Sequence, residues 1–198
     1  MTDEEVRAFL SRYERSQGIK VKGRDDLYFE DDTANGLELK FPETPLSAPY
    51  FARLVSMLGT DGDEGMFYGA TLWITLHDIG SPQLEKAGWM QVELMRRGFG
   101  ENRPIDVASG HWFRNGEVVE LAAFVLPCFV FGWDAYIIPS GGKLFIHISH
   151  DEYWAVIARD EETFEKCHQA LLELNPLMGN QALLSRFCPN SKLLKAVG

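Results

Sequence analysis

The sequence predicts an α+β fold, a single domain (residues 1–198) in which helices pack against a mostly antiparallel sheet. Helical and strand patterns are interspersed along 198 residues, a length that fits one domain with a sizeable core. Three consecutive strand candidates, at about 129–138, 143–149 and 153–158, are joined by short turns and must run antiparallel. Hydrophobic residues make up 45% of the chain, which is enough apolar surface to drive ordering.

The first part of the chain, residues 1–65, predicts an acidic helix followed by a hairpin. Thr2 can cap a helix over about 3–16, and Glu5 stands three residues after it, as in a capping box. Apolar residues recur at helical spacing along this segment, and Gly18 ends it. The helix therefore has both a start and a stop signal.

Strand signals follow this helix. Segments 26–30 and 36–41 flank the stretch DDTANG, whose Asn35-Gly36 pair favours a turn with positive φ. Three prolines then interrupt the chain, and a short helix is expected at about 48–58. The stretch GTDGDEG after it is a loop by composition and lacks the spacing of a calcium-binding loop.

The middle of the chain predicts one strand and one well-marked helix. Residues 66–78 are rich in aromatic and β-branched side chains, which is typical of a strand. Ser81 can cap the next helix, Pro82 is its first residue and Gly98 ends it. Gly88 lies on the apolar face of this helix and indicates a close approach to the sheet.

The segment before the meander is harder to assign. Residues 99–115 show no regular pattern and are expected to be irregular. Asn115-Gly116 can turn a hairpin or start a helix, and the apolar spacing after it favours a helix at about 116–126 that ends at Pro127.

After the meander the sequence predicts a last long helix and a peripheral tail. The helix covers about 161–174, with Asp160 as its cap. The tail, residues 177–198, predicts a short helix near 181–187 and a loosely packed end.

The first hairpin of the meander brings polar and aromatic residues together. Gly141-Gly142 is a signal for a two-residue type I′ turn. Such a turn places Tyr136 opposite His147, and by the same register Asp134 lies opposite Ser149. A turn one residue longer would invert the first strand and scatter this group, so the arrangement depends on the turn.

The second hairpin extends the same face. A turn of two residues or of four places Ser149 opposite Trp154 and His147 opposite Val156. One face of the meander is then apolar and belongs to the core. The other face, which we name the aromatic-polar face, carries Asp134, Tyr136, Ile138, Phe145, His147, Ser149, Trp154 and Val156.

The polar end of the aromatic-polar face is the candidate binding site. Aromatic residues supply contact area and a polar handle in pockets and interfaces. The candidate binding residues are Asp134, Tyr136, His147, Ser149 and Trp154, together with His111, which could line a cleft.

Three chemical interpretations of the stretch HISHDEYW stay open. An acid–base pair requires Asp134 to orient His147. A metal site at His147 and His150 needs a carboxylate from the turn, and it is disfavoured because residues three apart on a strand point to opposite faces. A histidine hydrogen-bonded within a polar turn explains the same residues without any site. No metal and no cofactor are expected.

Composition and absent motifs make several functions unlikely to fit. The net charge of −10 repels phosphate, which argues against nucleic acid or an anionic membrane as a partner. The apolar run 118–133 is shorter than the roughly 20 residues of a spanning helix. The three cysteines form no C-x-x-C pair, and the first residues are charged, so a cytoplasmic protein is expected. Motifs for nucleotide binding, serine hydrolysis and metalloproteolysis are missing.

These observations lead to a binding hypothesis. We expect a cytoplasmic interaction protein, of the adaptor, regulator or toxin-neutralising type, that holds a protein partner, and a basic partner would suit its acidic surface. It would use the aromatic-polar face and the acidic residues of 24–43, where seven carboxylates stand against two basic groups. The alternative is a small-molecule enzyme or ligand-binding domain with a pocket near Asp134, Tyr136, His147 and Trp154.

Overall fold

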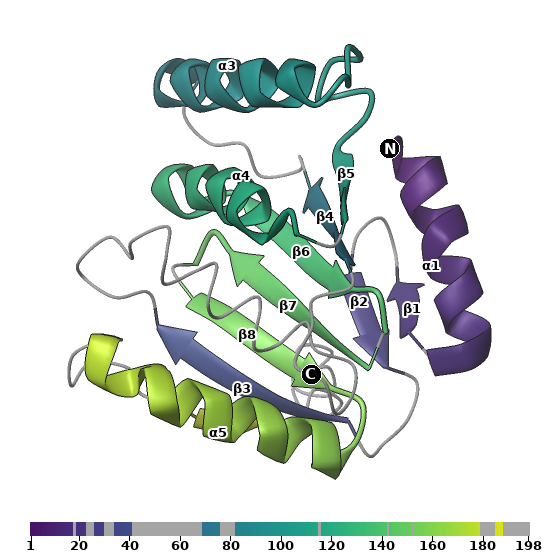
Figure 1. Ribbon diagram of the computed structural model, residues 1–198, viewed down its shortest axis with the longest axis vertical. Helices are drawn as coiled ribbons and strands as arrows, with labels where there is room; N and C mark the ends of the chain where they lie inside the picture. The colour runs from purple at the N-terminus through teal and green to yellow at the C-terminus, as the bar shows by residue number, and fades with distance from the viewer. Residues whose placement is uncertain are drawn as a thin grey trace, which may run out of the picture.

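The computed structural model describes ten segments of the chain: residues 1–17, 19–22, 26–29, 34–40, 69–75, 82–114, 116–141, 143–151, 153–178 and 185–187. They contain helices and strands in an α+β arrangement, as predicted (Figure 1). The helices are α1 (Asp3–Gln17), α3 (Pro82–Gly98), α4 (Val118–Phe131) and α5 (Glu161–Met178). The strands are β1 (Ile19–Lys22), β2 (Asp26–Phe29), β3 (Asn35–Lys40), β4 (Gly69–Thr75), β5 (Gly110–Arg114), β6 (Asp134–Pro139), β7 (Leu144–Ser149), β8 (Tyr153–Ala158) and β9 (Ser185–Phe187).

The strands form two antiparallel sheets. Seven of them make the main sheet in the order β5-β4-β6-β7-β8-β3-β9, and β1 pairs with β2 in a separate hairpin. The predicted meander is present as β6, β7 and β8, at the centre of the main sheet. The central strands therefore have a partner on both sides, and their backbone groups are satisfied within the sheet.

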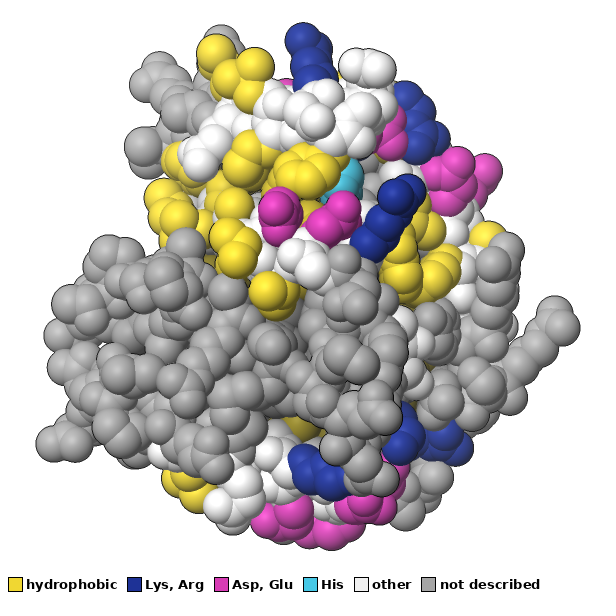
Figure 2. All heavy atoms as spheres, viewed as in Figure 1, with side chains coloured by type: hydrophobic (Ala, Val, Ile, Leu, Met, Phe, Trp, Pro, Cys, Tyr) yellow, Lys and Arg dark blue, Asp and Glu magenta, His cyan; other side chains and the backbone are white. Residues whose placement is uncertain are grey.

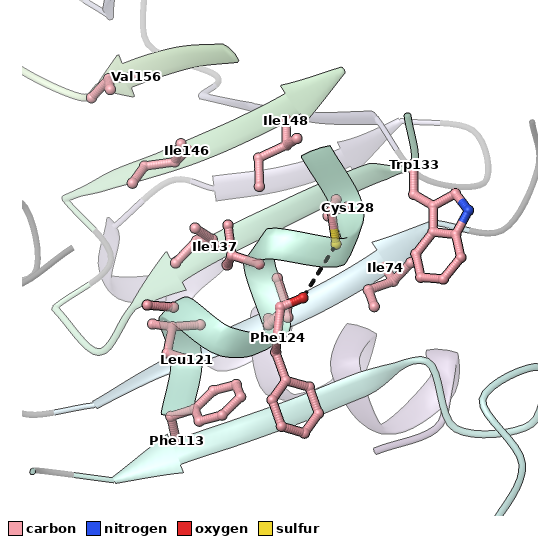
Figure 3. Close-up of a cluster of buried hydrophobic side chains, with 14 of the residues drawn as sticks. Ile74, Phe113, Leu121, Phe124, Cys128, Trp133, Ile137, Ile146, Ile148 and Val156 are labelled. Atoms are coloured by element: carbon pink, nitrogen blue, oxygen red, sulfur yellow. Dashed lines mark hydrogen bonds between the residues drawn. The ribbon is translucent and has the colours of Figure 1, made fainter. Parts of the chain in front are cut away.

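The main sheet is covered on both faces. Helices α3, α4 and α5 contribute to a cluster on one face, which we name the α4-side core. Figure 3 shows how α4 lays Leu121, Phe124 and Cys128 over the sheet residues Ile137 and Ile146. On the other face, α1 and the β1–β2 hairpin cover a second cluster, the α1-side core.

Local capping chemistry was predicted correctly. At the start of α1, Glu5 N donates to Thr2 Oγ1 (3.1 Å) and Thr2 N donates to Glu5 Oε2 (2.7 Å), which completes the capping box. At the start of α5, Thr163 N donates to Asp160 Oδ1 (2.8 Å). Helix α3 begins at Pro82 and ends at Gly98, as its signals indicated.

The predicted end of α4 at Pro127 is wrong. The helix continues to Phe131 and ends at Gly132, which has the left-handed φ of 64°. A proline inside a helix costs about 3 kcal/mol. Burying a Phe-sized side chain recovers about 1.5–3 kcal/mol, and Phe124, Val125 and Cys128 are all buried on this helix. The free energy gained by burying these side chains exceeds the cost of Pro127 in the helix. The first meander strand consequently begins at Asp134 rather than near residue 129.

Two other expectations about strands are wrong. Segments 26–30 and 36–41 do not form a hairpin with each other, because β2 pairs with β1 whereas β3 pairs with β8 and β9. Asn35-Gly36 lies within β3, with Gly36 opposite Ile157 and Phe187. The long-range partners of β3 took precedence over the local turn signal.

The segments expected to be irregular or helical also contain strands. Residues 110–114 form β5, which pairs with β4 at one edge of the main sheet. Residues 185–187 form β9 and not part of a helix. Gly88 does mark a close approach, but its neighbour is the ring of Phe131 on α4 and not the sheet. A Cβ at Gly88 would lie 2.4 Å from Phe131 Cδ2.

A buried arginine ties α3 to the loop between α3 and β5. The side chain of Arg96 is 2% exposed, and its Nη2 donates to the Ala108 carbonyl. One turn earlier, Glu93 Oε1 accepts from Ile105 N (2.5 Å) and lies 3.9 Å from Arg96 Nη1. The loop is thereby held against α3 at two backbone positions.

Some expectations fall outside the described residues. These are the short helix at 48–58, the loop GTDGDEG, the part of DDTANG before Ala34, and both ends of the strand expected at 66–78. Among the helices that are described, none combines the length and the apolar character needed to cross a membrane.

Candidate functional site

The first hairpin of the meander has the predicted register. Tyr136 pairs with His147 across β6 and β7, and Ala135 pairs with Ile148. The Tyr136 and His147 rings are stacked, with centroids 4.6 Å apart and an interplanar angle of 13°. The phenol and the imidazole are therefore cross-strand neighbours, as the glycine turn indicated.

The second hairpin has a different register. Ser149 pairs with Tyr153, and His147 pairs with Ala155, so the turn contains three residues, 150–152. A shift of one residue moves every side chain of β8 to the other face. Val156 accordingly belongs to the α4-side core, and the Tyr153 ring lies edge-on to His147 at 6.1 Å.

The correction changes the candidate residue on β8. Trp154 pairs with Ile148 and not with Ser149, and its side chain lies outside the described part of the chain. Tyr153 takes the place that Trp154 was expected to hold. Sequence reasoning missed it because turns of two and of four residues give one parity, whereas the observed turn of three gives the other.

Most of the aromatic-polar face is buried. Tyr136, Ile138 and Phe145 belong to the α1-side core, where Phe29 of β2 packs its ring 5.4 Å from that of Phe145. Figure 1 shows α1 and the β1–β2 hairpin beside this part of the sheet. The flat docking surface that the sequence indicated is thus internal over the middle of the strands.

At the end of the strands three polar side chains remain in contact with solvent. We name Asp134, His147 and His150 the His–Asp cluster. Asp134 is the first residue of β6, His147 lies on β7, and His150 opens the turn to β8. Their side chains are 15%, 22% and 42% exposed, respectively.

The Asp134 carboxylate connects the cluster. Its Oδ1 accepts a hydrogen bond from the His150 backbone N (2.9 Å), and its Oδ2 lies 2.7 Å from His150 Nδ1. His147 Nε2 is 3.8 Å from Asp134 Oδ1, which is an ion-pair distance when the imidazole is protonated. One carboxylate therefore serves two imidazoles and also ties the β7–β8 turn to β6.

Neighbouring groups complete the surroundings of the cluster. His150 Nε2 points toward Asp151, whose Oδ1 is 3.5 Å away. Ser149 is buried, and its Oγ accepts a hydrogen bond from Asp151 N (3.2 Å). On the strand beside β6, Thr75 Oγ1 donates to the Asp134 carbonyl (3.2 Å). The hydroxyls thus hold the backbone, and the carboxylates and imidazoles face outward.

The chemical property that this cluster offers is an imidazole held in a fixed orientation. A carboxylate at Nδ1 fixes the ring and leaves Nε2 to exchange a proton or to contact a ligand. An acid–base pair of His147 and Asp134 was one of the open interpretations, but His150 is the histidine in close contact. Sequence reasoning considered His150 only as a metal ligand beside His147. The signal that could have found it is that Asp134 lies opposite Ser149, the residue just before His150. In the part of the chain that the structure describes, no group of three or more His, Cys, Asp or Glu side chains could hold a metal ion.

His111 lies on the other side of the sheet. It pairs with Leu72 of the α4-side core, and its ring stacks on Phe124 at 5.0 Å, with the Phe113 ring at 4.7 Å. Burial among these rings, together with the positive charge of Arg96, lowers the pKa of His111 to about 4. The structure does not bring His111 to the other candidate residues.

The burial of His111 predicts that the stability of the protein depends on pH. The imidazole is neutral in the folded protein and becomes protonated on unfolding below about pH 6.5. The unfolded chain then binds more protons, so stability falls as the pH decreases from about 6.5 to 4. Since the ring is only half-buried, we expect a loss on the order of 1–2 kcal/mol after allowing for solvent screening.

The variant His111→Phe should remove this acid-sensitive part, because phenylalanine fills the same aromatic site without titrating. Urea unfolding at pH 4.5 and pH 7 measures both proteins. Equal acid sensitivity of the two would show that His111 does not cause it. His168, on α5, supplies the control variant His168→Phe, for which the wild-type pH dependence should persist.

Cys128 and Cys167 do not add a reactive group to this region. Both are buried, and burial raises the pKa of each thiol to about 12. A thiol with such a pKa is not a nucleophile at neutral pH.

A separate exposed surface lies over α3 and α4. Figure 2 shows hydrophobic side chains gathered on these helices. Met90 and Leu94, one turn apart on α3, are 65% and 66% exposed, and Val119 and Val130 of α4 are exposed to a similar extent. Exposed apolar side chains that gather in one region are typical of protein contact surfaces.

No protein-family model, no curated protein and no solved structure matches this chain.

Proposed function

We propose that this is a cytoplasmic interaction protein that holds a basic segment of a protein partner at the His–Asp cluster. The observation that supports it is the Asp134 carboxylate, which two His150 donors orient and which remains partly exposed. A carboxylate that is already oriented loses little entropy when it accepts a further cationic donor.

Charge and surface composition support the same kind of partner. Asp151 adds a carboxylate that is 70% exposed beside the cluster. The net charge of −10 attracts a basic protein over longer distances and repels nucleic acid. The apolar side chains on α3 and α4 offer additional contact area, which a protein partner needs and a small ion does not.

Binding of matched peptides tests this proposal. A panel of basic and acidic peptides of equal length is titrated against the full chain at low and at physiological salt. We expect basic peptides to bind more tightly, and their affinity to fall with salt. Asp151→Asn should weaken binding about fivefold, the effect of one exposed ion pair of about 1 kcal/mol. Glu165→Gln on α5, which removes an exposed negative charge away from the cluster, is the control and should bind as the wild type does.

Two results would count against the proposal. Equal affinity for acidic and basic peptides would show that the carboxylates do not select the partner. An unchanged affinity in Asp151→Asn, together with a loss in Glu165→Gln, would place the binding surface elsewhere.

A ligand-binding or acid–base role for the same cluster is a second candidate. The 2.7 Å contact between His150 Nδ1 and Asp134 Oδ2 favours it, because such a contact orients an imidazole for proton transfer. A turnover that His150→Gln abolishes and Asp151→Asn leaves intact would support this candidate over the first.

A further inference from the structure

We propose that the His–Asp cluster is a proton-controlled receptor for an arginine side chain, which it holds at neutral pH and releases on acidification. This rests on the proposed function and names both the group that is bound and the regulation of its binding. The basis is geometric: two imidazoles share the carboxylate that would bind the cation.

The charge of the site depends on both histidines. With neutral imidazoles, Asp134 and Asp151 give the site two negative charges. When His147 and His150 are protonated, their two positive charges cancel these, and the site becomes neutral. Histidine is the side chain whose charge ordinarily changes between pH 5 and 8, so acidification adds positive charge to the site.

Each protonated imidazole has partners already in place. Protonation of His150 adds a hydrogen at Nε2, which faces Asp151 Oδ1 at 3.5 Å, while Nδ1 keeps its 2.7 Å hydrogen bond to Asp134 Oδ2. Protonated His147 would pair with Asp134 Oδ1 and lie over the face of the Tyr136 ring, which attracts a cation. A proton on either ring therefore places a positive charge beside the carboxylates that an arginine would use.

The described groups that face the cluster come from each adjoining element. β6 contributes Asp134 and Tyr136, the turn contributes Asp151, and β8 contributes Tyr153, whose ring is edge-on to His147. The carboxylates and the two imidazoles therefore account for the change in charge among these groups.

Arginine fits this site better than lysine does. A planar guanidinium donates in parallel to two carboxylate oxygens and stacks on aromatic rings, and the cluster offers both kinds of contact. Asp134 is fixed in orientation, Asp151 is exposed beside it, and the Tyr153 and His147 rings border them.

The test compares two peptides that differ in charge alone. A short peptide with blocked ends carries a single arginine, and its control carries citrulline, which has nearly the same shape and no charge. Binding to the full chain is followed by NMR at pH 5.5, 6.5 and 7.5 through the backbone N–H of His150. We expect the arginine peptide to bind about tenfold more tightly at pH 7.5 than at pH 5.5, since two charges change. The citrulline peptide should bind weakly at every pH.

Histidine variants identify the source of the pH dependence. In the double variant His147→Gln/His150→Gln the glutamines keep a hydrogen-bond donor but do not titrate, so arginine binding should no longer vary with pH. His168→Gln on α5 is the control and should keep the wild-type dependence. The protein fold is checked in each variant from the dispersion of the NMR spectrum.

The possible results separate the two proposals. Equal binding of the arginine peptide at pH 5.5 and 7.5 overturns the proton control and leaves the proposed function standing. Binding of neither peptide at any pH, or equal binding of arginine and citrulline, overturns the receptor and the proposed function for this site together. A pH dependence that persists in the double variant assigns the control to other groups and overturns the inference.

Discussion

Replacing Arg96 by methionine is expected to lower the free energy of unfolding by about 2–4 kcal/mol. Methionine has a similar length but cannot donate to the Ala108 carbonyl, which would be left buried without that donor. The same change removes the cation 3.9 Å from Glu93. The loop between α3 and β5 would lose one of its two anchors on α3.

A counteracting effect limits this loss. Burial lowers the pKa of Arg96 below its ordinary value, which shows that the guanidinium is poorly solvated, and its Nη1 has no hydrogen-bond partner. Methionine relieves that desolvation. Replacing both members of a buried ion pair often leaves the stability of a protein unchanged, whereas removing one member leaves the other charge without a partner and destabilises the fold. Since Glu93 stays in the single variant without its cation, we expect the lost interactions to exceed the gain from relieved desolvation, so that the variant is less stable.

Urea unfolding followed by circular dichroism measures the effect. Arg97→Met is the control, because Arg97 is the exposed neighbour in the same helical turn, and it should change stability by less than about 0.5 kcal/mol. Adding Glu93→Gln to Arg96→Met should recover part of the loss, since glutamine still accepts from Ile105 N without a charge. Equal losses in Arg96→Met and Arg97→Met would contradict the anchoring role.

Gly110→Ala is expected to destabilise the protein by about 2–3 kcal/mol through a clash with α1. A Cβ at Gly110 would lie 2.3 Å from Val6 Cγ2 and 3.1 Å from Met1 Cβ. Val6 is fully buried, and a β-branched side chain in a helix has essentially one rotamer, so it cannot turn away. The helix itself would have to move off β5.

The double variant Val6→Ala/Gly110→Ala tests that cause. Shortening Val6 removes the clashing methyl group, so the double variant should be more stable than the sum of the two single losses predicts. Gly98→Ala is the control, since a Cβ there meets nothing within 4 Å. Strict additivity in the double variant would show that the Val6 methyl is not the obstacle.

The parts of the fold that the sequence predicted are those that depend on neighbouring residues. Thr2 and Glu5 cap α1 because both partners lie within one turn, and Asp160 caps α5 for the same reason. The first hairpin has the register that the local turn signal predicted, so the stacking of Tyr136 on His147 could be expected from neighbouring residues.

The parts that could not be predicted depend on distant contacts. The partners of β3 are β8 and β9, which no local signal in residues 35–40 indicates. Pro127 remains inside α4 because the helix buries its apolar side chains on the sheet, and a sequence pattern does not show that burial. The sequence left open whether the aromatic-polar face is exposed or buried, because nothing in the meander itself reveals that α1 covers it.

The candidate site also contains contacts that the local sequence predicted and contacts that it did not. Asp134 and His147 were expected together, because their proximity follows from one hairpin register. The closer partner, His150, depends on how the β7–β8 turn folds back on β6, and so does the exchange of Trp154 for Tyr153. The length of the β7–β8 turn therefore determines which β8 side chain lies at the site and which histidine contacts Asp134.

The place of β3 in the main sheet has a consequence for the synthesis of this protein. Leu37 of β3 pairs with Val156 of β8, more than a hundred residues later in the chain. At a translation rate of roughly 5–20 residues per second, β3 waits on the order of 6–24 s for this partner to emerge. During that interval its backbone edge is open to any other strand, and long loops are slow to close. We expect nascent chains stalled before residue 153 to aggregate or to recruit chaperones, and chains stalled well beyond β8 to be protected.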